Sequence, residues 1–115
     1  MLDEKSPVIY GDGSQTRDFT FVDDVVTVNI LAAESPSTGI FNVAGGKRIT
    51  INELAQSIIT LCKKDITVTY MDPRDGDIKH SLADITNAKE KLNYEPKFNI
   101  TEGIKETIQW FQKQA

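Results

Sequence analysis

The β-prone runs of this chain are few and short, and this feature most constrains what the chain can fold into. Each run has four or five residues, and turns or helical patterns separate the runs. A complete doubly wound sheet needs more strands, and none of these runs is followed by a phosphate-cradling glycine turn. The order of elements therefore predicts an α+β fold that packs against something larger. The runs are residues 7–10, 18–22, 40–44 and 66–70.

Four segments carry helical patterns, and several of their ends have capping signals. Thr50 and Glu53 have the spacing of a capping box, and Asn99 and Glu102 repeat that spacing before the last helix. Asn93 suits the left-handed position that often follows a helix. The predicted helices are residues 24–34, the segment after Thr50, residues 85–92 and residues 100–112.

The size and charge of the chain narrow its function. Its 115 residues predict one domain, residues 1–115, which is short for binding both a dinucleotide cofactor and a second substrate. A formal net charge of -4 without a basic cluster argues against a nucleic-acid partner. No apolar run reaches the ~20 residues that cross a bilayer. Cys62 is the single cysteine and His80 the single histidine, so we expect a reducing, cytoplasmic compartment and no metal site.

Two arginines stand at positions suited to phosphate binding. Arg17 lies between a glycine-rich turn and a β-prone run, and Arg74 lies in a charged, aperiodic loop. A guanidinium on a loop beside a strand can bind two phosphate oxygens, and two such groups would offset the charge of a diphosphate. For Arg17 the alternative is an ion pair with the neighbouring Asp18. For Arg74 the alternative is an ion pair with Asp75 or Asp77.

Other candidate residues have simpler interpretations. Tyr10 and Phe19 could line a pocket for a flat ring or a sugar, although aromatic side chains on strands also serve as core. Residues 11–13 resemble the start of a dinucleotide fingerprint but lack its third glycine, which favours a plain turn. His80 is expected to be solvated or to lead into a helix, and Cys62 to be a buried structural thiol.

Seven segments, spread from about residue 7 to residue 112, match one enzyme family in order and spacing. They are residues 7–13, 15–19, 22–25, 41–51, 74–78, 83–96 and 102–111. Together they resemble the substrate side of extended short-chain dehydrogenase/reductases, and more narrowly nucleotide-sugar epimerases of the UDP-glucose 4-epimerase type. The resemblance implies a small α+β substrate-binding domain with short strands and about four helices, the C-terminal part of a Rossmann-type α/β enzyme.

The resemblance also implies what this chain does not supply. The family binds NAD on an N-terminal Rossmann domain with a Gly-x-x-Gly-x-x-Gly turn, and it works with a Tyr-x-x-x-Lys pair. Neither motif occurs in the sequence. We therefore assign no catalytic residue, expect no cofactor on this chain, and expect the chain to be inactive alone. The implied partners are a UDP-sugar and either the missing Rossmann domain or a second copy that covers an exposed apolar face.

Seven positions correspond to the family's nucleotide-sugar site. Arg17 and Arg74 resemble its two diphosphate-binding arginines, and Asp77 resembles the carboxylate that contacts the ribose hydroxyls. Phe19 stands where some members of the family have tyrosine. The residues expected around the nucleotide base are Val8, Tyr10, Phe19 and Ile51.

The resemblance implies a function for the chain as the substrate-binding portion of a UDP-glucose 4-epimerase-like enzyme. In this role it anchors the nucleotide diphosphate while NAD oxidises and then reduces the sugar at C4. Two alternatives stay open. One is the same portion of a nucleotide-sugar 4,6-dehydratase, which shares the scaffold. The other is a non-catalytic interaction module derived from this fold.

Overall fold

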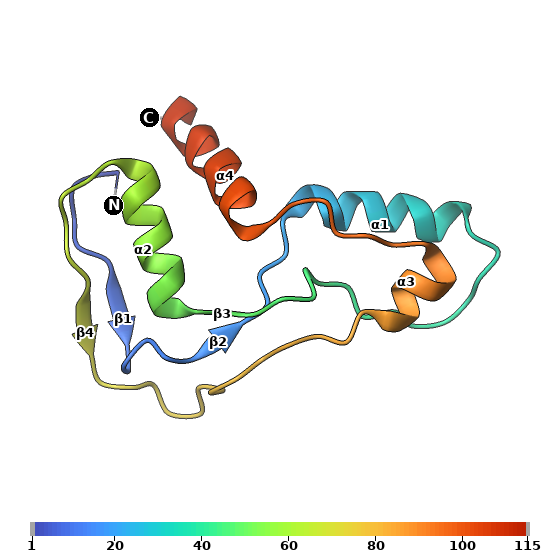
Figure 1. Cartoon of the computed structure of the whole chain (residues 1–115), viewed down its shortest axis with the longest axis horizontal. Helices are drawn as coiled ribbons and strands as arrows, with labels where there is room; N and C mark the ends of the chain where they lie inside the picture. The colour runs from blue at the N-terminus through green and yellow to red at the C-terminus, as the bar shows by residue number, and fades with distance from the viewer. Residues whose placement is uncertain (1, 115) are drawn as a thin grey trace.

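The computed structural model describes residues 2–114, and in this part of the chain four helices are joined by short strands and extended segments (Figure 1). The molecule is flat, with extents of 49 × 35 × 17 Å. This architecture confirms the predicted α+β fold with about four helices. The elements in order are β1 (Val8–Tyr10), β2 (Thr16–Arg17), α1 (Val22–Glu34), β3 (Ile49–Thr50), α2 (Ile51–Cys62), β4 (Thr69–Met71), α3 (Thr86–Leu92) and α4 (Ile100–Gln114).

The strands form two separate two-stranded sheets. β1 runs parallel to β4, with Val8 opposite Thr69, and β2 runs antiparallel to β3, with Thr16 opposite Thr50. Figure 1 shows β1, β4 and α2 at one end of the molecule, α1 and α3 at the other, and the β2–β3 pair between them. The β2–β3 pair therefore links the two ends.

Two of the four predicted strands are wrong. Residues 18–22 follow the strand rather than form it, because β2 ends at Arg17 and α1 begins at Val22. Residues 40–44 form no strand and pair with no strand of the described residues 2–114. An alternating pattern reports the surroundings of side chains, whereas a strand also needs a partner for its backbone groups. The other two strands are confirmed, although β4 lies at Thr69–Met71 rather than at residues 66–70.

The predicted helices and their caps are confirmed. Thr50 Oγ1 accepts from the Glu53 backbone N–H at 3.1 Å, and the Glu53 carboxylate accepts from the Thr50 N–H at 2.7 Å. Asn99 and Glu102 make the same reciprocal pair before α4, at 2.9 and 3.0 Å. Asn93 adopts the expected left-handed conformation, with φ 55°. Side-chain caps thus set where α2 and α4 begin, whereas the residues immediately before α1 and α3 make no such bond.

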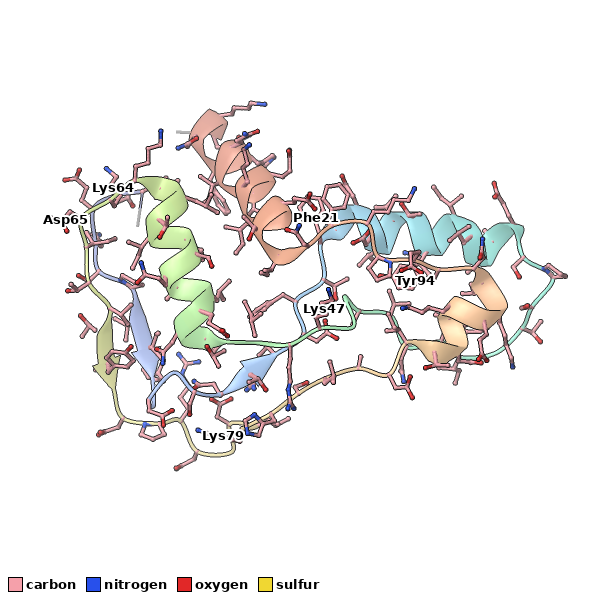
Figure 2. All side chains as sticks on the ribbon, viewed as in Figure 1. Phe21, Lys47, Lys64, Asp65, Lys79 and Tyr94 are labelled. Atoms are coloured by element: carbon pink, nitrogen blue, oxygen red, sulfur yellow. The ribbon has the colours of Figure 1, made fainter. Side chains whose placement is uncertain are left out.

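The most buried side chains lie at the end of the molecule formed by α1 and α3. Tyr94 is 1% exposed, and its hydroxyl donates to the Ala44 carbonyl oxygen at 2.8 Å. Figure 2 shows Tyr94 between these two helices. Burial raises the pKa of the Tyr94 hydroxyl above its usual value, which keeps it a neutral donor. The cluster consists of Val28, Ala44, Ile85, Ala88, Leu92 and Tyr94.

Two aspartates bind backbone amides across the fold. Asp24 of α1 is 2% exposed, and its carboxylate accepts from the N–H groups of Lys97 and Phe98 at 2.9 and 3.2 Å. Asp18 accepts from the N–H groups of Gly45 and Gly46, both at 3.0 Å. The four backbone N–H groups lie outside helices and strands, so these carboxylates supply the acceptors that regular secondary structure would otherwise supply.

No helix of the described residues 2–114 is long and apolar enough to cross a membrane. Within the same residues, no group of three histidine, cysteine, aspartate or glutamate side chains is placed to hold a metal ion.

Candidate functional site

Six of the seven residues predicted to bind a nucleotide-sugar line one cavity. The cavity has a volume of about 380 Å³ and lies between β1, the start of α2 and the loop that follows β4. The roles of these residues stay predictions, but the fold brings their side chains together from distant segments. The lining residues are Val8, Ile9, Tyr10, Gln15, Arg17, Ile51, Arg74, Asp75, Gly76 and Asp77.

The structure places Phe19, the seventh predicted residue, elsewhere. Phe19 follows the end of β2 and lines a larger apolar cavity of about 670 Å³ with side chains of α2 and α4. Strand β2 ends at Arg17, which lines the first cavity, and Phe19 lies two residues beyond the end of this strand. Cys62 lines the same apolar cavity and is partly exposed, in contrast to the buried thiol expected from the sequence.

Strand β1 supplies the apolar wall of the candidate site. Successive side chains of a strand point to opposite faces. Ile9 is 4% exposed, whereas Val8 and Tyr10 are 46% and 37% exposed on the other face. Gln15 also lines the cavity although it was not among the predicted site residues, and its Nε2 donates to the Tyr10 carbonyl oxygen at 2.9 Å. Gln15 stands two residues before Arg17 in one of the motifs that carry the family resemblance, and this position could have marked it as a site residue.

The turn between β1 and β2 fixes where Arg17 enters the site. Asp12 accepts from the backbone N–H of Ser14 at 2.9 Å and from its hydroxyl at 2.6 Å. These bonds hold the pKa of Asp12 at about 2. Gly13 has φ 75°, and a Cβ at this position would lie 2.0 Å from Asn52 Oδ1. Glycine is therefore required at residue 13, which agrees with the plain turn favoured by the sequence.

Arg17 is oriented by two oxygens from different segments. Its Nη1 donates to the Thr16 carbonyl oxygen at 2.7 Å, and its Nη2 donates to Asp77 Oδ1 at 2.6 Å. The alternative pairing with Asp18 is wrong, because Asp18 binds backbone amides instead. Arg17 thus faces the cavity with its planar group already held at one edge.

Arg74 lies over an aromatic ring rather than beside a carboxylate. Its Cζ is 4.0 Å from the centre of the Tyr10 ring, a cation–π contact. No carboxylate of the described residues 2–114 lies within ion-pair distance of Arg74. The alternative pairing with Asp75 or Asp77 is therefore wrong, and Arg74 keeps its charge available to an anion.

The arrangement combines a flat ring with two guanidinium groups at one hollow. Arg17 and Arg74 both line the cavity, and Tyr10 contributes its ring beside them. Guanidinium groups bind phosphate oxygens through paired, charge-assisted hydrogen bonds. The cavity can therefore hold a group that is anionic at one end and flat or apolar at the other.

Comparison with known proteins identifies the family. Residues 1–107 match the family described as GDP-mannose 4,6 dehydratase. The chain is 38% identical over 111 residues to UDP-glucuronate 4-epimerase of Thermodesulfobacterium geofontis, covering 96% of this chain and 34% of that protein.

Solved structures give the same result. UDP-N-acetylglucosamine 4-epimerase from Methanobrevibacter ruminantium, in complex with UDP-N-acetylmuramic acid, is 49% identical, with a TM-score of 0.94. UDP-glucose 4-epimerase from Thermotoga maritima, with UDP-glucose, is 40% identical, with a TM-score of 0.95. The match covers 99% of this chain and 37% of each of those structures.

This chain thus spans about a third of the length of the relatives it matches, and it corresponds to their C-terminal part. The structural neighbours are NAD-dependent epimerases of the extended short-chain dehydrogenase/reductase family, as the resemblance implied. From the match over residues 1–107 and these likenesses, the chain belongs to the GDP-mannose 4,6 dehydratase family, within the extended short-chain dehydrogenase/reductases.

Proposed function

We propose that this chain binds the nucleotide part of a UDP-sugar in the cavity lined by β1 and the loop after β4. The observation that carries the proposal is the convergence of Arg17 and Arg74 on one cavity beside the Tyr10 ring. The relative from Thermotoga maritima was solved with UDP-glucose, which supports a ligand of this class. A UDP-sugar has both the anionic diphosphate and the flat base that this cavity suits.

In the proposed complex the two arginines hold the diphosphate. Arg17 exchanges part of its interaction with Asp77 for phosphate oxygens, and Arg74 reaches them from the Tyr10 ring. Both groups start close to these positions, so little side-chain freedom is lost on binding. Charge-assisted hydrogen bonds contribute about 1.5–3 kcal/mol each, which makes the diphosphate the main anchor.

The nucleoside occupies the rest of the cavity in this proposal. Val8 and Ile51 provide apolar contacts for the base, with the Tyr10 ring beside them. Arg17 uses Oδ1 of Asp77, so the second oxygen of this carboxylate can accept from a ribose hydroxyl. Phe19 has no part in this complex, because it lines the other cavity.

The glycine turn of this chain does not fit NAD. UDP-glucuronic acid 4-epimerase from Bacillus cereus was solved with NAD, so relatives bind this cofactor. In a dinucleotide site the glycine turn leads into a helix whose N-terminus meets the pyrophosphate. Here the turn at residues 11–15 leads into strand β2. We therefore assign this chain the anchoring of a UDP-sugar during C4 epimerisation and no step of hydride or proton transfer.

The proposal is tested by calorimetric titration of the chain with UDP and with UDP-glucose. Arg17→Ala and Arg74→Ala are each expected to weaken UDP binding roughly ten- to hundredfold, and the double variant to abolish it. Arg48→Ala is the matched control, because Arg48 is exposed and outside the cavity. Undiminished binding by the double variant would overturn the role of the arginines. Self-association without nucleotide binding would favour an interaction module.

A further inference from the structure

The loop that carries Arg74 and Asp77 is attached to the rest of the molecule at both of its ends. At its start the β1–β4 ladder holds it, and the Gly11 N–H donates to the Met71 carbonyl oxygen at 2.8 Å. At its far end it meets strand β2, which carries Arg17. The relative position of the two arginines therefore depends on both attachments.

The far attachment consists of backbone and side-chain bonds to a single residue. The Thr16 N–H donates to the Lys79 carbonyl oxygen at 2.8 Å, and the Ser81 N–H donates to the Thr16 carbonyl oxygen at 3.1 Å. Between these bonds, Thr16 Oγ1 and His80 Nδ1 share a hydrogen bond of 2.9 Å. His80 is exposed, in line with the solvated position expected from the sequence, but it does not lead into a helix and instead contacts a strand far away in the sequence.

The two partners differ in exposure, and neither lines the cavity. Thr16 is 8% exposed, whereas His80 is exposed. The cavity is lined by Arg17, the residue after Thr16, and by Asp77, three residues before His80. The Thr16–His80 bond thus joins the residue before Arg17 to a residue shortly after Asp77 without lining the cavity itself.

We propose that Thr16 and His80 are positioning residues for diphosphate binding, a role that rests on the proposed function of the cavity. Their hydrogen bond fixes strand β2 against the loop, so that Arg17 and Arg74 stand at the spacing a diphosphate needs. Binding through two guanidinium groups is sensitive to the distance between them, because each group donates well only to oxygens in a narrow range of positions. The nucleoside side of the cavity rests on β1 and α2, and neither element takes part in this side-chain bond. Strand β2 and the turn before it reach the start of α2 through backbone bonds of their own, which substitutions of these two side chains leave in place.

The matched variants of His80 separate the hydrogen bond from the bulk of the ring. In His80→Asn the side-chain amide stands near the place of Nδ1, so the bond to Thr16 is kept. In His80→Gln the amide corresponds to the position of Nε2, and in His80→Ala the bond is lost. Thr16→Ser keeps the hydroxyl, and Thr16→Val removes it at nearly constant shape. Circular dichroism melts identify any variant that fails to fold.

The experiment compares the affinities of these variants for UDP and for uridine. His80→Ala, His80→Gln and Thr16→Val are expected to weaken UDP binding roughly fivefold. His80→Asn and Thr16→Ser should restore it to within about twofold, and uridine binding should stay unchanged in all five. A merely structural role would weaken both ligands alike.

The outcomes separate this inference from the proposed function. If the unaltered chain binds UDP and the three disrupting variants bind it equally well, the positioning role is overturned while the function stands. Equal losses for UDP and uridine also overturn it. If the unaltered chain binds no UDP, the proposed function fails and the positioning role fails with it. A second readout is the ¹⁵N spectrum of the single histidine, in which Thr16→Val should shift the Nδ1 signal.

Discussion

Arg17 Nη2 lies 2.6 Å from Asp77 Oδ1, yet both side chains remain partly exposed, at 27% and 37%. Ion pairs that water reaches contribute at most about 1 kcal/mol to folding, because solvent screens them and ordering the side chains costs entropy. The pair can therefore separate at little cost when a stronger anion arrives.

A double-mutant cycle with Arg17→Met and Asp77→Asn tests this balance. We expect a coupling in the free energy of unfolding of about 0.2–1 kcal/mol, decreasing further at high salt. Chemical denaturation of the four proteins measures it. A coupling above about 2 kcal/mol would show that the pair is a structural element and not an interaction that a ligand replaces.

Replacing Asp24 is expected to destabilise the fold strongly. Its buried carboxylate accepts from the N–H groups of Lys97 and Phe98, and an amide offers one acceptor where the carboxylate offers two. Asp24→Asn should lower the free energy of unfolding by about 2 kcal/mol, and Asp24→Ala by more. The neighbouring Asp23→Asn, at an exposed position of α1, is the control and should change it by less than about 0.5 kcal/mol. Equal effects at the two positions would contradict the structure.

The buried hydroxyl of Tyr94 is expected to contribute more than an exposed one. Tyr94→Phe leaves the Ala44 carbonyl oxygen without its donor inside the core and should cost about 1–2 kcal/mol. Tyr70 provides the comparison, because its hydroxyl donates to Asn52 Oδ1 while the residue is 53% exposed. Tyr70→Phe should cost less than half as much, because water can replace the bond. Thermal melts of the two variants make the measurement.

Asp12 is expected to titrate near pH 2. Hydrogen bonds from the Ser14 hydroxyl and backbone lower its pKa from 3.8 to about 2 in the folded chain. A carboxyl whose folded pKa is depressed stabilises the fold above its unfolded pKa, and this contribution disappears as the pH falls through the folded pKa. The window is therefore between about pH 4 and pH 2. Carboxyl ¹³C shifts should show the midpoint, and Ser14→Ala should raise it. A midpoint unchanged by that variant would refute the cause.

The helices were predictable from the sequence because their end signals are local. The hydroxyl of Thr50 and the carboxylate of Glu53 meet across a single turn, so their spacing alone indicates the bond. Strands were harder to predict, since residues 40–44 have the right pattern and no pairing partner in the described chain. Residue patterns record local preference, whereas strand pairing depends on what else the fold brings alongside.

For the candidate site, too, the sequence indicated the residues but not the contacts between them. The sequence identified Arg17 and Arg74 by residue type and by family resemblance, and the fold places both at one cavity. It did not indicate that Asp77 would meet Arg17, or that Arg74 would lie over Tyr10. The first contact arises because the loop after β4 returns to β2, and the second because β4 pairs with β1, which places Tyr10 opposite Met71. Both are long-range approaches that no local pattern encodes.

Strand β2 has two residues, and they serve opposite sides of the site: Thr16 is buried against the loop, and Arg17 faces the cavity. Because side chains alternate along a strand, moving the chain by one position would exchange these two faces. One added or deleted residue in the turn at residues 11–15 would turn the guanidinium away from the ligand while leaving the composition almost unchanged. The length of this turn is therefore as much a determinant of nucleotide recognition as any side chain that touches the ligand.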